Sequence, residues 1–278
     1  MNTDHELTSE QVETFSEDGY LIVRDLFDIE ETEMLLRAAN SDRLMSKYSM
    51  NIHDRSGKNS KITVWNHPGN NIWGMVSRSA RIVDAMEALL GGEVYHYHSK
   101  LLFKEPEVGG AWEWHQDYGY WYKNGCLYPN LASCWIALNR ADKKNGCMQV
   151  LKGSHHVGRI DHGVHSGQNC AEPERVEQLL KNLELVYCEL EAGSAMFFHC
   201  NTLHRSDANT SERNRWNLIC CYNMAKNNPY IESLHPKYTP LEKVSNSAIK
   251  EAGLKLSNNS DSFYKPDEHS IRLGHTAR

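Results

Sequence analysis

The stretch Val94–Phe103, VYHYHSKLLF, begins the part of the chain that decides the fold. It is rich in aromatic and aliphatic residues, and a Gly-Gly pair separates it from the preceding segment. Similar runs recur downstream, broken by Gly, Pro and Asn; they are Trp112–Tyr122, Ser133–Asn139, Cys147–Leu151, Leu185–Leu190, Ser194–His199 and Trp216–Met224. Seven short strands separated by turn residues predict a β-sandwich or a small barrel. We therefore expect a mainly β fold.

Helices are predicted on the flanks of this β region. Thr8-Ser9-Glu10 can cap a helix that Asp18-Gly19 ends, and a short β-type run follows at 20–23. Further helical patterns cover Ile29–Ala39, Ser79–Leu90 and, between two strands, Glu172–Leu183. Residues 41–79 show no firm period and are expected to be loop-rich.

The chain shows no repeat and no clean linker, so we expect one domain over residues 1–278. It divides into a helical N-terminal part at about 1–92, a β core at about 93–225 and a tail at about 226–278. The tail contains several prolines and little β character, and we expect it to wrap the outside.

Composition restricts the classes of function. The 278 residues carry a net charge of −6 and are 40% hydrophobic, which excludes a disordered or fibrous chain. Without a Lys/Arg-rich run, the acidic balance does not favour a nucleic-acid partner. No apolar run approaches the roughly 20 residues of a membrane span. A polar start, MNTDHE, and eight cysteines without a Cys-x-x-Cys pair favour a cytoplasmic protein with reduced, mostly buried thiols.

The segment Trp114-His115-Gln116-Asp117 places an imidazole and a carboxylate two residues apart in a predicted strand, and hence on one face. His204 lies far downstream, in FHCNTLHRS, and Arg215 follows it by 215 − 204 = 11 residues. Two imidazoles and one carboxylate on one side of a metal form the facial triad of non-haem Fe(II) oxygenases, which leaves positions open for a co-substrate and O₂. An arginine can anchor a carboxylate through two parallel hydrogen bonds.

Together, these residues resemble the phytanoyl-CoA dioxygenase family of Fe(II)/2-oxoglutarate oxygenases, which includes ectoine hydroxylases. The shared pattern is His-x-Asp, a distant His, Ser two residues after that His and Arg eleven after it. Shorter matches are GYLIV at 19–23, FKEP at 103–106, GCMQV at 146–150 and GSH at 153–155, where Lys152 replaces the family's usual Pro. The resemblance covers about residues 10–225. It implies a double-stranded β-helix (jelly-roll, cupin-like) core with flanking helices.

The resemblance also implies roles for individual residues. Fe(II) would be bound by His115, Asp117 and His204. The co-substrate 2-oxoglutarate would be bound by Arg215 and Ser206, with Ser133 as a further contact, and Trp121 matches a substrate contact. The implied reaction couples the oxidation of 2-oxoglutarate by O₂ to succinate and CO₂ with hydroxylation of a substrate C–H bond. Family members that halogenate have a small residue at the aspartate position, so Asp117 favours hydroxylation.

Several alternatives stay open. The His-x-Asp pair could be a hydrogen-bonded pair within a sheet, and Arg213 competes with Arg215, although only Arg215 has the family spacing. The run Tyr95-His96-Tyr97-His98 is a rival metal motif, but its histidine face has no nearby carboxylate. His155-His156 and residues 161–165, DHGVH, fall in a predicted loop where histidines are usually solvated, although such a loop could also cover the site.

Strand alternation predicts what lines the pocket. If the metal-binding pair faces inward, Trp121 shares its face, whereas Tyr120 points to the other side. In the preceding strand, the basic side chains of His96, His98 and Lys100 then face inward. Burying them is costly unless an anion or water pairs with them. Asparagines of the last predicted strand also face inward. The expected substrate-binding residues are Trp121, Lys100, His98, His96, Asn217 and Asn223.

Such a lining favours a small anionic or zwitterionic metabolite, such as an amino acid derivative or an aminophosphonate-like compound. A lipid or acyl-CoA substrate, which the family name suggests, would need an apolar tunnel. A non-catalytic binding module on the same fold usually lacks a metal ligand, whereas this chain has all three. The sequence therefore predicts an Fe(II)- and 2-oxoglutarate-dependent hydroxylase of a small molecule, either a monomer or a homodimer.

Overall fold

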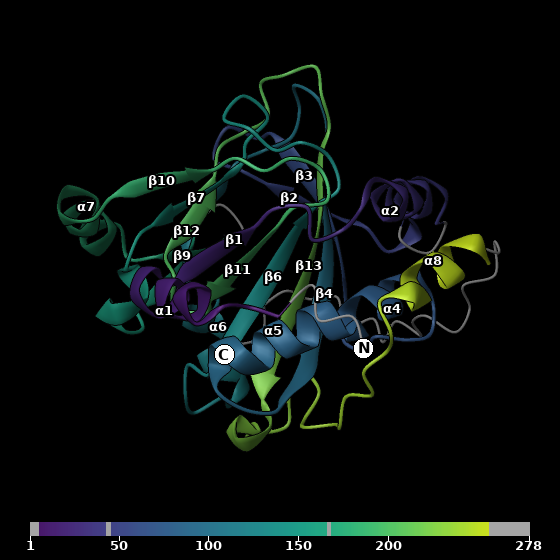
Figure 1. Cartoon of the computed structure of the whole chain (residues 1–278). Coiled ribbons are helices and arrows are strands. Elements are labelled where there is room, and N and C mark those ends of the chain that lie inside the picture. Colours follow the sequence, from purple (N-terminus) through teal and green to yellow (C-terminus); the bar gives the residue numbers. More distant parts are fainter. Residues whose placement is uncertain (1–5, 43–45, 166–167, 256–278) are drawn as a thin grey trace.

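A computed structural model of the chain describes residues 6–42, 46–165 and 168–255, and it is mainly β with flanking helices (Figure 1). The helices are α1 (Ser9–Asp18), α2 (Ile29–Ser41), α4 (Ile72–Arg78), α5 (Ala80–Leu90), α6 (Tyr118–Trp121), α7 (Pro173–Asn182) and α8 (Ser247–Leu254). The strands are β1 (Tyr20–Val23), β2 (Met50–His53), β3 (Asn59–Trp65), β4 (Val94–Lys104), β5 (Trp112–His115), β6 (Leu131–Ala137), β7 (Met148–Leu151), β8 (His162–His165), β9 (Gln168–Ala171), β10 (Leu185–Cys188), β11 (Ala195–His199), β12 (His204–Ser206) and β13 (Arg215–Met224).

The strands form three antiparallel sheets. The largest has the order β1-β11-β6-β13-β4-β3-β2, the second has the order β10-β7-β12-β5, and β8 pairs with β9. Figure 1 shows α5 lying across the large sheet. On that face the sheet packs against α1, α2, α4 and α5, and on the other it shares a buried layer with the second sheet. The central strands are therefore buried on both faces, which explains why they are continuous apolar runs.

The helix boundaries follow the predicted capping signals. Thr8 caps α1 in a capping box with Gln11, and Gly19 ends the helix with a φ of 81°. Gly91 ends α5 in the same left-handed conformation. A side chain at position 19 would also collide with His155 and Thr202, so this turn requires glycine.

Two predictions of local structure are wrong. Residues 41–79 were expected to be loop-rich, but they contain β2, β3 and α4. Strand β2 has only four residues, so its alternation of Met50 and Ile52 with polar residues is too short to stand out. The run Trp112–Tyr122 is a strand only to His115, because the backbone at Asp117 is already helical and α6 follows.

A bulge in β4 changes which side chains face inward. Cys221 pairs with His98 and Tyr222 pairs with His96, so Tyr97 is the extra residue. His96 consequently packs against Tyr222 in the layer beneath the helices, whereas Tyr97 lies in the layer between the sheets. His96 therefore does not belong to the predicted row of inward-facing basic side chains.

The tail does more than wrap the outside. Ile249 of α8 is fully buried in the layer that contains α2 and α4. His235 is stacked on Tyr97, with ring centroids 4.6 Å apart. All eight cysteines are free and buried. Among the described residues, no helix combines the length and the apolarity that crossing a membrane requires.

Candidate active site

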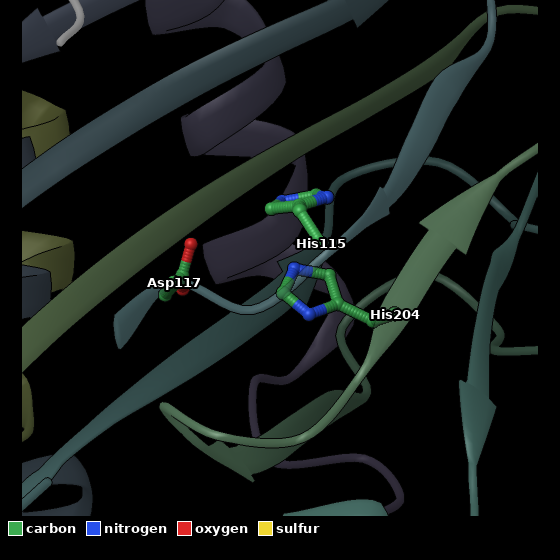
Figure 2. Close-up of side chains that lie close together, drawn as sticks. All are labelled: His115, Asp117 and His204. Atoms are coloured by element: carbon green, nitrogen blue, oxygen red, sulfur yellow. The ribbon is translucent and has the colours of Figure 1, made fainter. Parts of the chain in front are cut away.

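Three predicted ligands meet on the second sheet, where β5 pairs with β12 (Figure 2). His115 ends β5, Asp117 follows it at the start of α6, and His204 begins β12 directly opposite His115. One ligand atom of each side chain lies within 4.8 Å of the others, and the two imidazole centroids are 4.1 Å apart. Among the described residues, these three form the one group of His, Cys, Asp or Glu with this geometry.

Backbone carbonyls fix the tautomers of both histidines. His115 Nδ1 donates to the carbonyl of Glu113 at 2.7 Å, and His204 Nδ1 donates to that of Thr202 at 2.9 Å. The Nε2 lone pairs are thus left for a metal, which is the usual arrangement of metal-binding imidazoles. Burial, followed by the neighbouring His204, lowers the pKa of His115 to about 3, and burial also lowers the pKa of His204. Neutral imidazoles are the form that binds a metal.

The third ligand is held as a carboxylate. Burial alone would raise the pKa of Asp117, but Lys100, the two imidazoles and the Tyr120 hydroxyl outweigh burial and lower it to about 2. The Lys100 ammonium lies 3.7 Å from Oδ1, which also accepts a short hydrogen bond from Tyr120. Ser133 donates to Oδ2 at 3.3 Å, so it contacts the metal-binding carboxylate. This donor set fits Fe(II) and leaves positions open on the ion.

A second polar group gathers around Ser206, at the other end of the site. The guanidinium of Arg215 is 2% exposed and lies 3.4 Å from Ser206 Oγ. Lys104, its direct cross-strand neighbour, is fully buried and donates to the same hydroxyl at 2.8 Å. Burial lowers the pKa of Arg215 to about 10 and, together with Arg215, lowers that of Lys104 well below its usual range. Lys104 Nζ is bonded within the protein, to Ser206 and to the carbonyl of Asp207, whereas Arg215 lines the cavity, so the guanidinium is the cation that suits an incoming carboxylate.

One cavity of about 200 Å³ joins the triad to Arg215 and Ser206. Its walls are mainly apolar, with a few polar side chains among them. Besides the triad and those two residues, they comprise Met50, Ile52, Ile62, Lys100, Leu102, Trp112, Tyr120, Trp135, Met148, Gln168, Asn169, Phe198, Arg205 and Ile219. Such a mixture is typical of small-molecule sites, in which a few polar groups fix the orientation of the ligand.

Of the residues expected to contact substrate, only Lys100 lines this cavity. Asn217 accepts a hydrogen bond from Arg215, and Asn223 is bonded to Tyr95 and Asn227. The rings of His98 and Trp121 pack on each other, outside the cavity wall, with centroids 5.4 Å apart. His96 faces the helices because of the β4 bulge, so the rival pair His96 and His98 does not share a face.

Sequence reasoning missed three contributions to the site. Lys104 lies in the FKEP match but was given no role. Tyr120 reaches Asp117 because the chain turns into α6, whereas strand alternation directed it away. Strand β2, which pairs with β3, supplies Ile52 to the cavity wall. Strand β9, which pairs with β8, supplies Asn169. Alternation at Met50–His53 was the only local signal for β2.

A triad of this kind beside a carboxylate site, between two antiparallel sheets, defines the class of non-haem Fe(II)/2-oxoglutarate dioxygenases. The family model for phytanoyl-CoA dioxygenase (PhyH) matches residues 15–216. The chain belongs to that family.

Relatives with assigned activities are similar over most of the chain. An ectoine dioxygenase from Bordetella parapertussis is 28% identical over 250 residues, covering 83% of this chain and 80% of the relative. An L-proline trans-4-hydroxylase from Streptomyces griseoviridis is 30% identical over 190 residues, covering 63% of this chain and 69% of the relative. The crystal structure of EctD from S. alaskensis with 2-oxoglutarate and 5-hydroxyectoine superposes with a TM-score of 0.72 at 21% identity, covering 88% of this chain and 90% of the other.

Proposed function

We propose that the protein hydroxylates a small polar metabolite, anionic or zwitterionic, in a reaction that consumes 2-oxoglutarate and O₂. The observation that carries this proposal is the cavity that joins the His-Asp-His triad to Arg215 and Ser206. The relatives named as ectoine dioxygenase and proline hydroxylase support a small substrate. We also propose that the two large sheets form a double-stranded β-helix, within a single domain over 1–278.

His115, Asp117 and His204 would hold the iron, which supplies the redox chemistry for O₂ activation when it is bound. The protein's own contribution is positioning. The Glu113 and Thr202 carbonyls orient the two imidazoles, and Arg215 and Ser206 would bind the distal carboxylate of 2-oxoglutarate. Lys104 adds a second donor at Ser206. The apolar wall excludes water from the reacting groups, which strengthens the electrostatic interactions among them.

A charged group in the cavity wall supports a small polar substrate over a lipid. Lys100 supplies an ammonium in the wall, 3.4 Å from the Tyr120 hydroxyl. An amino acid derivative or an aminophosphonate-like compound would place its anionic group there. Eight free, buried cysteines support a cytoplasmic location.

Anaerobic visible absorbance tests the proposed chemistry. Adding Fe(II) and then 2-oxoglutarate to the purified protein should produce a charge-transfer band that requires both additions. Succinate release in air, screened over small anions and zwitterions, should then increase with the true substrate. A folded protein that binds Fe(II) but gives no band with 2-oxoglutarate would contradict the proposal and favour a binding module.

Lys100→Met is expected to raise the KM for that substrate at least about tenfold, because it removes a cation that is buried in the cavity wall. The KM for 2-oxoglutarate should change much less. Lys123→Met removes the same charge from an exposed position and serves as the control. An unchanged substrate KM in Lys100→Met would exclude the proposed anion contact.

A further inference from the structure

Gln116 stands between two metal ligands in the sequence, and its side chain is fully buried. The carboxamide makes three short hydrogen bonds to backbone groups of two other segments. Its oxygen accepts from the N–H of Ile160 at 2.7 Å. Its nitrogen donates to the carbonyls of Gly158 and Asn201, each at 2.8 Å. A buried carboxamide satisfied in this way fixes the relative positions of the segments that it joins.

One of these segments leads directly to the predicted ligand His204. Asn201 precedes Thr202, whose carbonyl accepts the hydrogen bond from His204 Nδ1. The neighbouring N–H of Leu203 is held by Ser154 Oγ at 2.8 Å. The side chain of Gln116 is therefore connected to the segment that sets the orientation of the His204 ring. Its own backbone carries His115 on one side and Asp117 on the other.

The other segment, Gly158–His162, supports Gln116 from outside the metal centre. His162 Nδ1 donates to the carbonyl of Ile160 at 2.8 Å, which leaves Nε2 to accept the backbone N–H of Gln116 at 2.9 Å. The ring lies so close to α6 that a Cβ at Gly119 would be 2.2 Å from it. Both ring nitrogens of His162 are engaged in this way, so this histidine at the start of β8, which was expected to lie in a loop, supports the site without serving as a ligand.

We propose that Gln116 is a positioning residue that sets the distance between His204 and the His115/Asp117 pair, with His162 holding Gln116 in place. The proposal rests on the proposed metal centre and is independent of the substrate. Outer hydrogen-bond partners of metal ligands commonly change metal affinity by about 10–100-fold. Gln116 differs from such partners in that its carboxamide bonds to the segment that leads to His204, so its loss removes a connection between the two ligand-bearing segments that adds to the pairing of β5 with β12.

The test is the affinity of the metal-free protein for Co(II), measured by calorimetry and by the visible spectrum of the bound ion. Gln116→Met keeps the volume of the side chain and removes all three hydrogen bonds. We expect its affinity to fall about 10–100-fold, with a changed Co(II) spectrum. Gln149→Met is the matched control, because Gln149 is 1% exposed and bonds to Arg205 and Asp207, neither of which belongs to the triad.

A second variant covers the case in which Gln116→Met does not fold. His162→Phe keeps a ring against Gly119 and removes the acceptor of the Gln116 N–H, and it should weaken Co(II) binding by a smaller factor. Wild-type affinity in whichever of the two variants folds would overturn the proposal. An equal loss in Gln149→Met, with an equal fall in Tm, would also overturn it, because the effect would then be general destabilisation. If the wild-type protein itself binds no Co(II), the proposed metal centre fails as well.

Discussion

His204→Ala is expected to abolish 2-oxoglutarate turnover and to lower metal affinity by more than about 100-fold, beyond the usual effect of losing an outer partner. The imidazole is one of only three side-chain ligands at the site, and two ligands cannot hold the ion in the same geometry. Succinate release and Co(II) titration measure the two effects. The charge-transfer band of the Fe(II)/2-oxoglutarate complex should also be absent in this variant.

The control for this prediction is His156→Ala, which removes an exposed histidine from a neighbouring loop. It should retain metal affinity and turnover within about twofold, as is usual for a surface substitution. Near-normal turnover in His204→Ala would show that the triad is not the metal site. The proposed function would then have no structural basis.

Arg215→Met is expected to raise the KM for 2-oxoglutarate at least about 30-fold. Removing one partner of a buried, charged hydrogen-bond pair usually costs at least about 2 kcal/mol, which corresponds to that factor. Ser206 remains in the cavity wall, so binding should be weakened rather than lost. Initial rates of succinate release at varied 2-oxoglutarate measure the change. Co(II) affinity should be unaffected, because Arg215 is not a ligand.

The chain offers a matched control two residues away. Arg213 is about half exposed and pairs with Asp142, and no cavity residue contacts it among the residues described. Arg213→Met should therefore leave the KM for 2-oxoglutarate within about twofold of the wild type. If Arg213→Met raised that KM and Arg215→Met did not, the assignment of the co-substrate anchor would have to be reversed.

The sequence predicted the parts of the molecule that depend on local signals or on spacing. Helix ends at Thr8 and Gly19 follow from capping chemistry, which acts within a few residues. The spacing of His115, Asp117 and His204 predicted a triad, and the structure brings these three side chains together. The apolar runs at β6 and β13 predicted strands, and the structure shows both strands to be buried on both faces.

Other features depend on tertiary structure and left little local signal. The bulge that reverses His96 is set by the pairing of β4 with β13, and nothing in VYHYH indicates where it falls. The change from strand to helix after His115 determines where Tyr120 and Trp121 lie, and one wrong element boundary therefore misplaced both. The side chain of Lys104 bonds to Ser206 and Asp207, which are 102 and 103 residues away.

The proposed carboxylate site at Arg215 and Ser206 also bears on how a catalytic cycle would end. These residues would bind the distal carboxylate of 2-oxoglutarate, which the reaction leaves intact. Succinate has the same carboxylate and would be held by the same donors. Succinate and the next 2-oxoglutarate would then compete for one anchor, so succinate is expected to inhibit competitively with 2-oxoglutarate. Discrimination between the two must come from the 2-oxo acid end, where only the co-substrate can chelate the metal.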